Sequence, residues 1–574
     1  MWAPKAWRVV LLILRPKLFI IPTHGHRFRI EKKEIVKKMA FLLHQLLSES
    51  AVKYPNKEAI IFKDQRMTYS ELERESSKLA YSLSEIGIGR GERVGIHMSR
   101  CINSIVGAFG ILKAGATYVP VDPMCPPSRL SYIINKGAIK VLLTSREKLT
   151  NIERAFPESS PVETILIMNG LKPGSGSPGF TKWIDWQEIR ESARGETPRT
   201  NTVDSDLAYI LFTSGSTGNP KGVMISHLNS LTFVNSAHDF FEIKMDDRFS
   251  NICPLHFDMS VFDLFVAFKA GASVVIVPES ISIFPSRLAE FIDKNKISVW
   301  NSVPSALSLL ANLTNLDHYD FSSLRLILFA GEVFPIKHLR RLQKSIPGAR
   351  FYNIYGQTEA NSSTYYWVEQ VPSDDAALLP IGKPFPNFEV FALNENGKRV
   401  SEAGEKGELY VRASSVALGY LGDVEKTKEC FVKNPLKPDL SERVYRTGDL
   451  VQLRTDGNFI FLGRKDHMIK SRGYRIEIGE IETVLRNHPG IMNAVVIPIP
   501  DELIGNRIAA VIVPVKKGTI GKEDIIRDCA TQLPKYMIPE IMEFRDSLTM
   551  TSSGKVDRES YTELFREELK SFTK

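Results

Sequence analysis

This 574-residue sequence lacks long hydrophobic runs and paired cysteines. Its apolar stretches at 9–14 and 18–21 are separated by Arg-Pro-Lys, so they fall short of the roughly 20 residues that a spanning helix needs. No uninterrupted core of a signal peptide is present either. The five cysteines are scattered, without the spacing of a zinc site or a disulfide framework. We therefore expect no stable membrane insertion and a cytoplasmic location.

Net charge is also lacking beyond the N-terminus. Residues 1–38 hold ten lysines and arginines against two glutamates, which accounts for the whole net charge of +8. The rest is neutral, which argues against a general electrostatic grip on nucleic acid, so we expect no nucleic-acid partner. The extension itself is either a basic, weakly membrane-seeking segment or sequence upstream of the natural start. We favour the second, because Met39 opens a helix, turn and strand pattern.

The length predicts more than one domain. Between 40 and 200, helical periods such as 72–86 alternate with short apolar runs such as 93–96. This alternation is typical of layered α/β sheets with largely parallel strands. We expect a large N-terminal α/β domain over 39–465.

From about 380 the pattern changes to short strands joined by glycine turns, which predicts a β-rich subdomain over 380–465. A polar, basic stretch then precedes helices expected near 480–487 and 522–533. We therefore predict a smaller, mobile α+β domain over 466–574.

The stretch 209–227 combines a strand-like apolar run with the loop TSGSTGNPKG. Glycines let backbone N–H groups crowd around an anion, hydroxyls add donors, and Lys221 adds a positive charge. The loop lacks the Gly-Lys-Ser/Thr ending of a P-loop, and no helix clearly starts on it. A Ser/Gly linker is the alternative, but the strand and the lysine favour a polyphosphate site.

Four other stretches have both a structural and a functional interpretation. Asp258 either caps the helix expected from about Ser260 or meets a substrate ammonium, and the residues alone favour the cap. The stretch NIYGQTE at 353–359 is a surface turn, or it stacks a base and holds phosphate and Mg²⁺. Asp449 is a turn residue or a ribose acceptor. Lys555, in a polar glycine-containing loop, is by itself expected to be a solvated lysine.

In combination, the ordered motifs resemble the AMP-forming adenylating enzymes, which include acyl-CoA synthetases, adenylation domains of nonribosomal peptide synthetases and firefly luciferase. The matching stretches, between 67 and 558, are MTYSEL, LKAGATYVPVDP, TSGSTGNPKGV, HFDMSVFD, NIYGQTE, YRTGDL, GRKDHMIKSRGYRIEIGEIE and SSGKVDR. The residues of these motifs are most similar to those of the aminoacyl-activating branch. The resemblance implies an AMP-forming acid–thiol ligase that uses ATP and Mg²⁺. An acyl-adenylate forms with release of pyrophosphate, and a thiol then takes the acyl group.

The resemblance also implies site residues. The phosphates would contact Thr213, Ser214, Gly215, Ser216, Thr217, Gly218 and Lys221. The adenosine would contact Gly331, Glu332, Asn353, Tyr355, Asp449, Phe461 and Arg464. Thr358, Glu359 and Lys555 would be catalytic, with Glu359 binding Mg²⁺ and Lys555 bridging the carboxylate and the α-phosphate. Asp466 would be a hinge whose rotation exchanges the Lys555 loop for the 471–476 loop.

With the resemblance included, the functional interpretation of Asp258 overtakes the cap, because it matches the aspartate that pairs with a substrate amino group. The pocket would comprise Asp258, Met259, Phe262, Asn301, Leu328, Ala330, Ile354, Ser362 and Ser363. This mixture suggests a smallish, partly polar amino acid. The chain departs from the family at Gln357, where proline is common, at Ala330 and at Phe461.

The acceptor thiol is expected to come from elsewhere, since only 16 residues follow position 558. We favour the phosphopantetheine of a separate carrier protein. The alternative is CoA, as in an acyl- or aryl-CoA ligase in which Asp258 serves structure only. A non-catalytic nucleotide-binding module is a further alternative, which the intact motifs disfavour.

Overall fold

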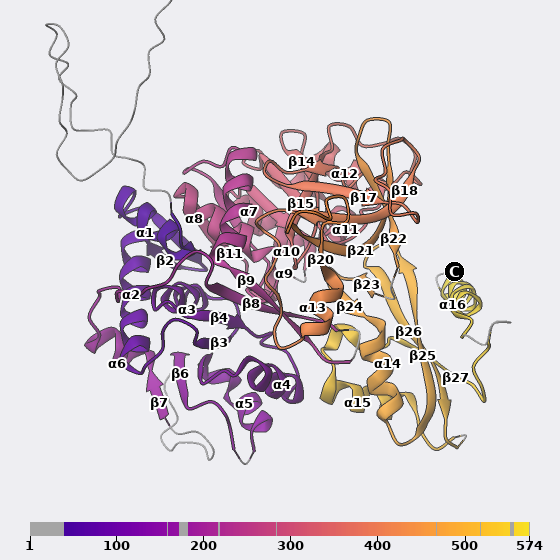
Figure 1. The fold of residues 1–574 in the computed structure, drawn as a ribbon, viewed down its shortest axis with the longest axis horizontal. Coiled ribbons are helices and arrows are strands. Elements are labelled where there is room, and N and C mark those ends of the chain that lie inside the picture. The colour runs from indigo at the N-terminus through magenta and orange to yellow at the C-terminus, as the bar shows by residue number, and fades with distance from the viewer. Residues whose placement is uncertain are drawn as a thin grey trace, which may run out of the picture. The chain divides into compact units, whose positions relative to one another are not determined.

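Two large sheets dominate the structure, a computed structural model that describes residues 40–157, 159–170, 182–215, 218–282, 284–465, 468–516, 518–550 and 556–572. The described residues from Phe41 onward belong to one compact unit. No helix in these ranges is both long and apolar enough to cross a bilayer. Figure 1 shows the ribbon in chain order.

The first large sheet has eight strands and carries the loop of 213–222. Its central pairs, from β8 through β4, β3, β5 and β6 to β7, are parallel, whereas β9 lies antiparallel to both β8 and β19. Its strands, in spatial order, are β19 (Gly419–Tyr420), β9 (Lys221–Ser226), β8 (Leu207–Thr213), β4 (Thr117–Pro120), β3 (Arg93–His97), β5 (Val141–Ser145), β6 (Thr164–Asn169) and β7 (Lys182–Asp185).

The second large sheet has nine strands. Its central pairs, from β14 through β13, β12, β10 and β11 to β1, are parallel. Antiparallel strands lie at both edges: β15 and β16 at one, and β2 at the other. Its strands, in spatial order, are β16 (Lys383–Pro384), β15 (Asn361–Trp367), β14 (Arg350–Gln357), β13 (Leu326–Ala330), β12 (Val299–Ser302), β10 (Arg248–Asn251), β11 (Ser273–Ile276), β1 (Glu58–Phe62) and β2 (Gln65–Thr68).

The helices alternate with these strands, as the sequence predicts. The helix expected over 72–86 is α2, which begins after Thr68, whose hydroxyl accepts the Glu71 N–H in a capping box. The helices of this part are α1 (Leu43–Lys53), α2 (Tyr69–Glu85), α3 (Ile102–Lys113), α4 (Pro127–Gly137), η1 (Arg146–Lys148), α5 (Leu149–Ala155), α6 (Trp186–Ser192), α7 (His227–Phe240), η2 (Phe262–Val266), α8 (Ala267–Ala270), α9 (Glu279–Ser282), α10 (Pro285–Asn295), α11 (Pro304–Leu313), η3 (Leu316–His318) and α12 (Ile336–Ser345).

A five-stranded antiparallel sheet follows, where the sequence predicts a β-rich subdomain. It comprises β17 (Glu389–Leu393), β18 (Lys406–Arg412), β20 (Phe431–Lys433), β21 (Arg443–Leu453) and β22 (Phe459–Arg464), and α13 (Val424–Cys430) precedes β20.

The last part of the chain, yellow in Figure 1, has its own hydrophobic cluster around Ile481, Val496 and Ile512. Its elements are β23 (Met468–Ser471), β24 (Tyr474–Glu477), α14 (Ile478–Asn487), β25 (Ile491–Asp501), β26 (Gly505–Pro514), α15 (Lys522–Gln532), η4 (Lys535–Met537), β27 (Ile541–Phe544) and α16 (Arg558–Phe572). The predicted α/β fold class is confirmed. The domain boundaries at 39 and 465 stay predictions.

Candidate active site

Two cavities meet at the carboxyl ends of the central strands of the nine-stranded sheet. The larger, which we call the cleft, has a volume of about 100 Å³. The smaller has a volume of about 20 Å³ and is called the side pocket below. Both are lined by Asp258, Met259, Ala330 and Ser362. A ligand in the cleft can therefore place a small group in the side pocket.

The loop between β8 and β9 forms one wall of the cleft. A Cβ on Gly215 would lie 2.0 Å from the Asn219 carbonyl oxygen, and Gly218 has φ +87°, so the loop needs both glycines. Thr213 and Ser214 line the cleft, and Thr213 Oγ1 is buried without a partner among the described residues. An unpaired buried hydroxyl is costly, and an anion in the cleft would satisfy it. Ser216 and Thr217 lie outside the described residues.

Glu359 is the centre of a buried charge cluster beside this loop. It is fully buried, with Arg475 Nη1 at 2.8 Å, Lys221 Nζ at 3.6 Å and a hydrogen bond donated by the Tyr420 hydroxyl at 2.7 Å. Burial raises the pKa of Glu359, but the two cations outweigh it and hold that pKa well below its usual value. Glu359 is therefore ionised.

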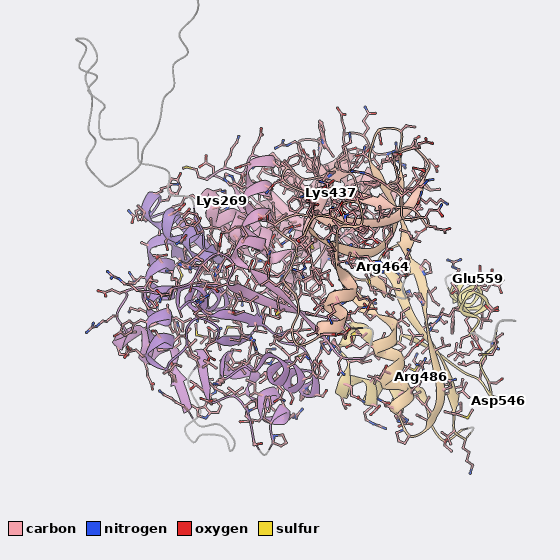
Figure 2. The ribbon with its side chains drawn as sticks, viewed as in Figure 1. Lys269, Lys437, Arg464, Arg486, Asp546 and Glu559 are labelled. Carbon is pink, nitrogen blue, oxygen red and sulfur yellow. The ribbon has the colours of Figure 1, made fainter. Side chains whose placement is uncertain are left out.

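Asp449 forms a second buried cluster, in β21. Its carboxylate accepts hydrogen bonds from Tyr355 and Gln357 and is paired with Arg464, which Figure 2 labels. The register of β21 and β22 sets Asp449 opposite Arg464. Burial raises the pKa of Asp449 and outweighs the opposite effect of Arg464. Gln357 thus takes part in this cluster through its side chain.

The remaining residues expected around adenine differ in what their side chains and backbones contact. Gly331 has φ +96° and lines the cleft, directly after β13. Glu332 accepts the backbone N–H of Ser305 at 2.9 Å and that of Gly473 at 2.5 Å. Asn353 donates to the Pro380 carbonyl at 2.8 Å, and Phe461 pairs with Val451 in the β21–β22 ladder. Of this group, only Gly331 is among the residues that line the cleft.

Asp258 lies in the turn before the π-helical turn η2, where the sequence places a helix start. Its carboxylate does not cap that helix through a side-chain bond in the described structure; it accepts the Thr358 hydroxyl at 2.8 Å. The pair joins two sequence motifs 100 positions apart, at the boundary of the side pocket and the cleft.

Neighbouring strands build the side pocket. Asn301, Leu328 and Ile354 come from β12, β13 and β14, whose parallel register brings their carboxyl ends together. Eight of the nine predicted pocket residues line it. The ninth, Ser363, is adjacent to Ser362 on β15, so it points to the opposite face, where it is fully buried and donates to the Asn361 carbonyl.

The structure adds several lining residues to the contacts expected for nucleotide and substrate. The side pocket also contains Phe233, Phe241, Asn361 and Phe385, and the cleft also contains Arg129, Phe212, His256, Phe257, Gly356, Gln357, Lys470, Gly473, Tyr474, Arg475 and Tyr536. The side-pocket residues belong to no motif and meet only through tertiary packing. Gly473, Tyr474 and Arg475 belong to the 471–476 loop, which the resemblance implies enters the site when the hinge turns, and Lys470 precedes that loop in the same basic motif, IKSRGYR.

The C-terminal part reaches the cleft through the segment Gly473–Arg475. Ser214 Oγ donates to the Arg475 carbonyl at 2.8 Å, and Gly215 N–H donates to Glu480 at 3.3 Å. Glu480 is also paired with Arg129 on α4, and both side chains are buried. The predicted hinge Asp466 and the predicted catalytic Lys555 lie outside the described residues.

Comparison with known proteins gives consistent matches. Residues 47–421 match the AMP-binding enzymes, and residues 480–555 match the C-terminal domain of AMP-binding enzymes. An L-proline–[L-prolyl-carrier protein] ligase of Pseudomonas fluorescens is 35% identical over 517 residues, which cover 90% of this chain and 98% of that protein. Bacitracin synthase 1 of Bacillus licheniformis is 36% identical over 524 residues, which cover 91% of this chain and 9% of the synthase.

Among solved structures, the amide bond synthetase McbA from Marinactinospora thermotolerans has the same fold. Its TM-score is 0.79 at 23% identity, and the match covers 91% of this chain and 99% of the synthetase. The structures of IdnL1 and of the NpsA–ThdA fusion from Klebsiella oxytoca each match with a TM-score of 0.73. The family matches span most of the chain and include the cleft loop, whereas Gly473–Arg475 lies between the two matched ranges. The predicted resemblance is confirmed: the chain belongs to the family of AMP-binding enzymes.

Proposed function

We propose that this chain activates an amino acid with ATP and transfers it to a thiol. A carboxylate oxygen of the amino acid attacks the α-phosphorus, the bond to the β-phosphate oxygen breaks, and pyrophosphate leaves with that electron pair. A thiolate sulfur then attacks the acyl carbon of the adenylate, and AMP leaves as a thioester forms. We take the thiol to be the phosphopantetheine of a separate carrier protein, because the similar Pseudomonas ligase acts on a prolyl-carrier protein.

The position of Asp258 is the observation that carries this proposal. Its carboxylate lies between an otherwise largely apolar side pocket and the cleft, with one hydrogen bond from Thr358. A carboxylate at that boundary suits a substrate ammonium, with the substrate side chain in the side pocket and its carboxylate in the cleft. A plain carboxylic acid would leave the charge of Asp258 without a partner.

The cleft suits a nucleotide in its chemistry. Thr213, Ser214 and Lys221 offer donors and a positive charge to phosphates, and in our proposal the loop residues Ser216 and Thr217 add to them. Asp449 would exchange its bonds from Tyr355 and Gln357 for ribose hydroxyls, which are also donors. Thr358 would contact the α-phosphate, where charge develops.

Glu359 is suited to be the one carboxylate that this chain offers to Mg²⁺, because it is ionised and lies beside the loop between β8 and β9. Mg²⁺ is usually held by one or two carboxylates together with substrate phosphates, and when bound it neutralises charge on those phosphates. The described residues contain no cluster of three or more metal-ligating side chains. Lys221 and Arg475 now pair with the carboxylate, so Arg475 must withdraw before metal occupies that position.

The orientation of the C-terminal part suits the transfer step. Gly473 and Arg475 occupy the wall of the cleft where a second orientation, turned about Asp466, would bring Lys555 instead. In our proposal adenylation uses the Lys555 orientation, and thioester formation uses this one. Two positions of one domain around a fixed site are a known kind of switch.

Pyrophosphate exchange tests the proposal, with amino acids and simple carboxylic acids assayed side by side. We expect exchange with an amino acid, and a loss of about 100-fold or more in Asp258→Asn, because the ammonium then lacks its charged partner. The matched control is Asp64→Asn, at an exposed turn position. Exchange with plain acids that Asp258→Asn leaves intact would contradict the proposal and favour an acyl-CoA ligase. Transfer assays with CoA and carrier proteins then identify the thiol.

A further inference from the structure

The side pocket contains an acceptor that has no partner. Asn301, 5% exposed, lines the pocket, and its Nδ2 donates to the Met259 carbonyl at 3.2 Å and to Asp263 Oδ1 at 3.0 Å. Both neighbours accept, so the amide nitrogen has to face them, and the orientation of the amide is fixed. Its two hydrogens are then used. Oδ1 of Asn301 has no hydrogen bond from any residue that the structure describes.

Asp263, one residue after the pocket-lining Phe262, holds Asn301 from behind. It is fully buried in the π-helical turn η2, a type of turn that often marks functional positions. Its carboxyl accepts Asn301 Nδ2 and also Asn251 Nδ2, the latter at 3.3 Å. It forms no ion pair with the described lysines, arginines or histidines. A buried carboxyl without an ion-pair partner is costly, and here it is stabilised by the two amides that it holds.

The pocket also contains a donor that has no partner. Asn361, at φ +58° and 8% exposed, lines the pocket, and its Oδ1 accepts the Ser362 N–H at 2.7 Å. That bond fixes this amide as well, and its Nδ2 has no bond to another described residue. Besides Asp258 and Ser362, one unpaired acceptor and one unpaired donor therefore line a cavity whose other walls are aromatic and aliphatic.

We propose that the side pocket selects an amino acid with a hydroxyl on a short side chain. A hydroxyl both donates and accepts, so it matches in kind both unpaired groups, Asn301 Oδ1 and Asn361 Nδ2. The cavity of about 20 Å³ is little more than the 10–15 Å³ that a water needs on this measure, which excludes long side chains. Asn301 is the specificity-determining residue, and Asp263 is a positioning residue that acts through it. The inference rests on the amino-acid activation proposed above.

Isosteric substrates test the selection in the unaltered enzyme. In pyrophosphate exchange we compare threonine with valine, and serine with alanine. We expect kcat/KM of the hydroxyl member to exceed that of its partner by about 100-fold, because an aliphatic side chain leaves both amide groups unpaired. If no amino acid supports exchange, the proposed function fails and this inference fails with it. If exchange occurs only with long side chains, or equally well with apolar ones, this inference alone is overturned.

Variants then separate positioning from structure. Asn301→Leu should bring the threonine-to-valine ratio near one or invert it, whereas Asn312→Leu, the same change on α11 where Asn312 bonds Ser308, should preserve the ratio. Asp263→Asn should raise KM for threonine about tenfold and leave valine unchanged. A purely structural Asp263 would lower activity toward both substrates alike, and that result would overturn its positioning role. The wild-type comparison decides the selection even where a variant fails to fold.

Discussion

The side pocket and the cleft are built from different parts of the chain. All residues that line the side pocket lie between 233 and 385, whereas the cleft is shared by residues 129–362 and residues 470–536. The side pocket is thus complete without the C-terminal part, and its amides are held by bonds within the N-terminal part. The cleft depends on how the C-terminal part is turned. In our proposal, substrate choice and the progress of the reaction are therefore separable, and variants can test that separation.

The largest expected effect belongs to Glu359, on which both parts converge. Glu359→Gln should lower pyrophosphate exchange by about 100- to 1000-fold, because it removes the buried charge that pairs with Lys221 and that, in our proposal, binds Mg²⁺ beside the phosphates. Initial exchange rates at saturating ATP measure this. The control Glu395→Gln, at an exposed turn position, should match wild type. Near-wild-type exchange in Glu359→Gln would show that the phosphate side of the cleft works without it.

Arg475 should separate the two half-reactions. Arg475→Met should slow transfer to the thiol by about 30- to 100-fold, because it removes the nearer of the two cations that pair with the buried Glu359 when the C-terminal part has the orientation seen here. Exchange should change less than threefold. The control is Arg472→Met, in the same segment, where Arg472 pairs with Glu540 of the C-terminal part itself. Equal losses in exchange and in transfer would contradict a role of Arg475 that is specific to the transfer step.

Asp263 should make stability depend on pH through the side-pocket region. Burial raises the pKa of Asp263 to about 7. This effect outweighs the Asn301 and Asn251 amides and Arg100, which lower that pKa. An acid whose pKa is raised in the folded state keeps its proton where the unfolded chain has lost it, so its contribution to stability falls as pH rises. Between pH 5 and 6.5 the free energy of unfolding should fall by about 2 kcal/mol relative to Asp263→Asn. Urea unfolding of both proteins measures this difference, and parallel pH curves would contradict it.

The smallest effect is expected where α4 contacts the C-terminal part. Arg129 and Glu480 form a buried ion pair, and Glu480 also accepts the Gly215 N–H of the loop between β8 and β9. Arg129→Met and Glu480→Gln should each slow transfer about tenfold, and the double variant should lose little more, because they remove one shared contact. A double-mutant cycle on the transfer rate measures the coupling. Additive losses would show that the two residues act separately.

The local chemistry of the site was predictable from the sequence. Glycines at 215 and 218 are required by a close backbone approach and a positive φ, and both follow an apolar run that forms β8. The helical period over 72–86 predicts a helix, and α2 forms there over Tyr69–Glu85. Such features depend on neighbours in the chain, so one sequence is enough to suggest them.

Pairings across the chain were not predictable from the residues alone. Asp258 has the pattern of a helix cap, and only the approach of the β14 end to that turn gives it Thr358 as a partner. Ser362 and Ser363 are equivalent in sequence, and the face of β15 decides that Ser362 lines the side pocket while Ser363 is buried behind it.

Motif spacing and hydrophobic period are local properties of the chain, so they were enough to predict the family, the fold class and the kinds of chemical group available. Tertiary structure alone decided which amide hydrogens of Asn301 are used and which C-terminal segment lies in the cleft. The physical reason is that a hydrogen-bond partner is set by geometry between distant strands. The residue type states only what a side chain can donate or accept.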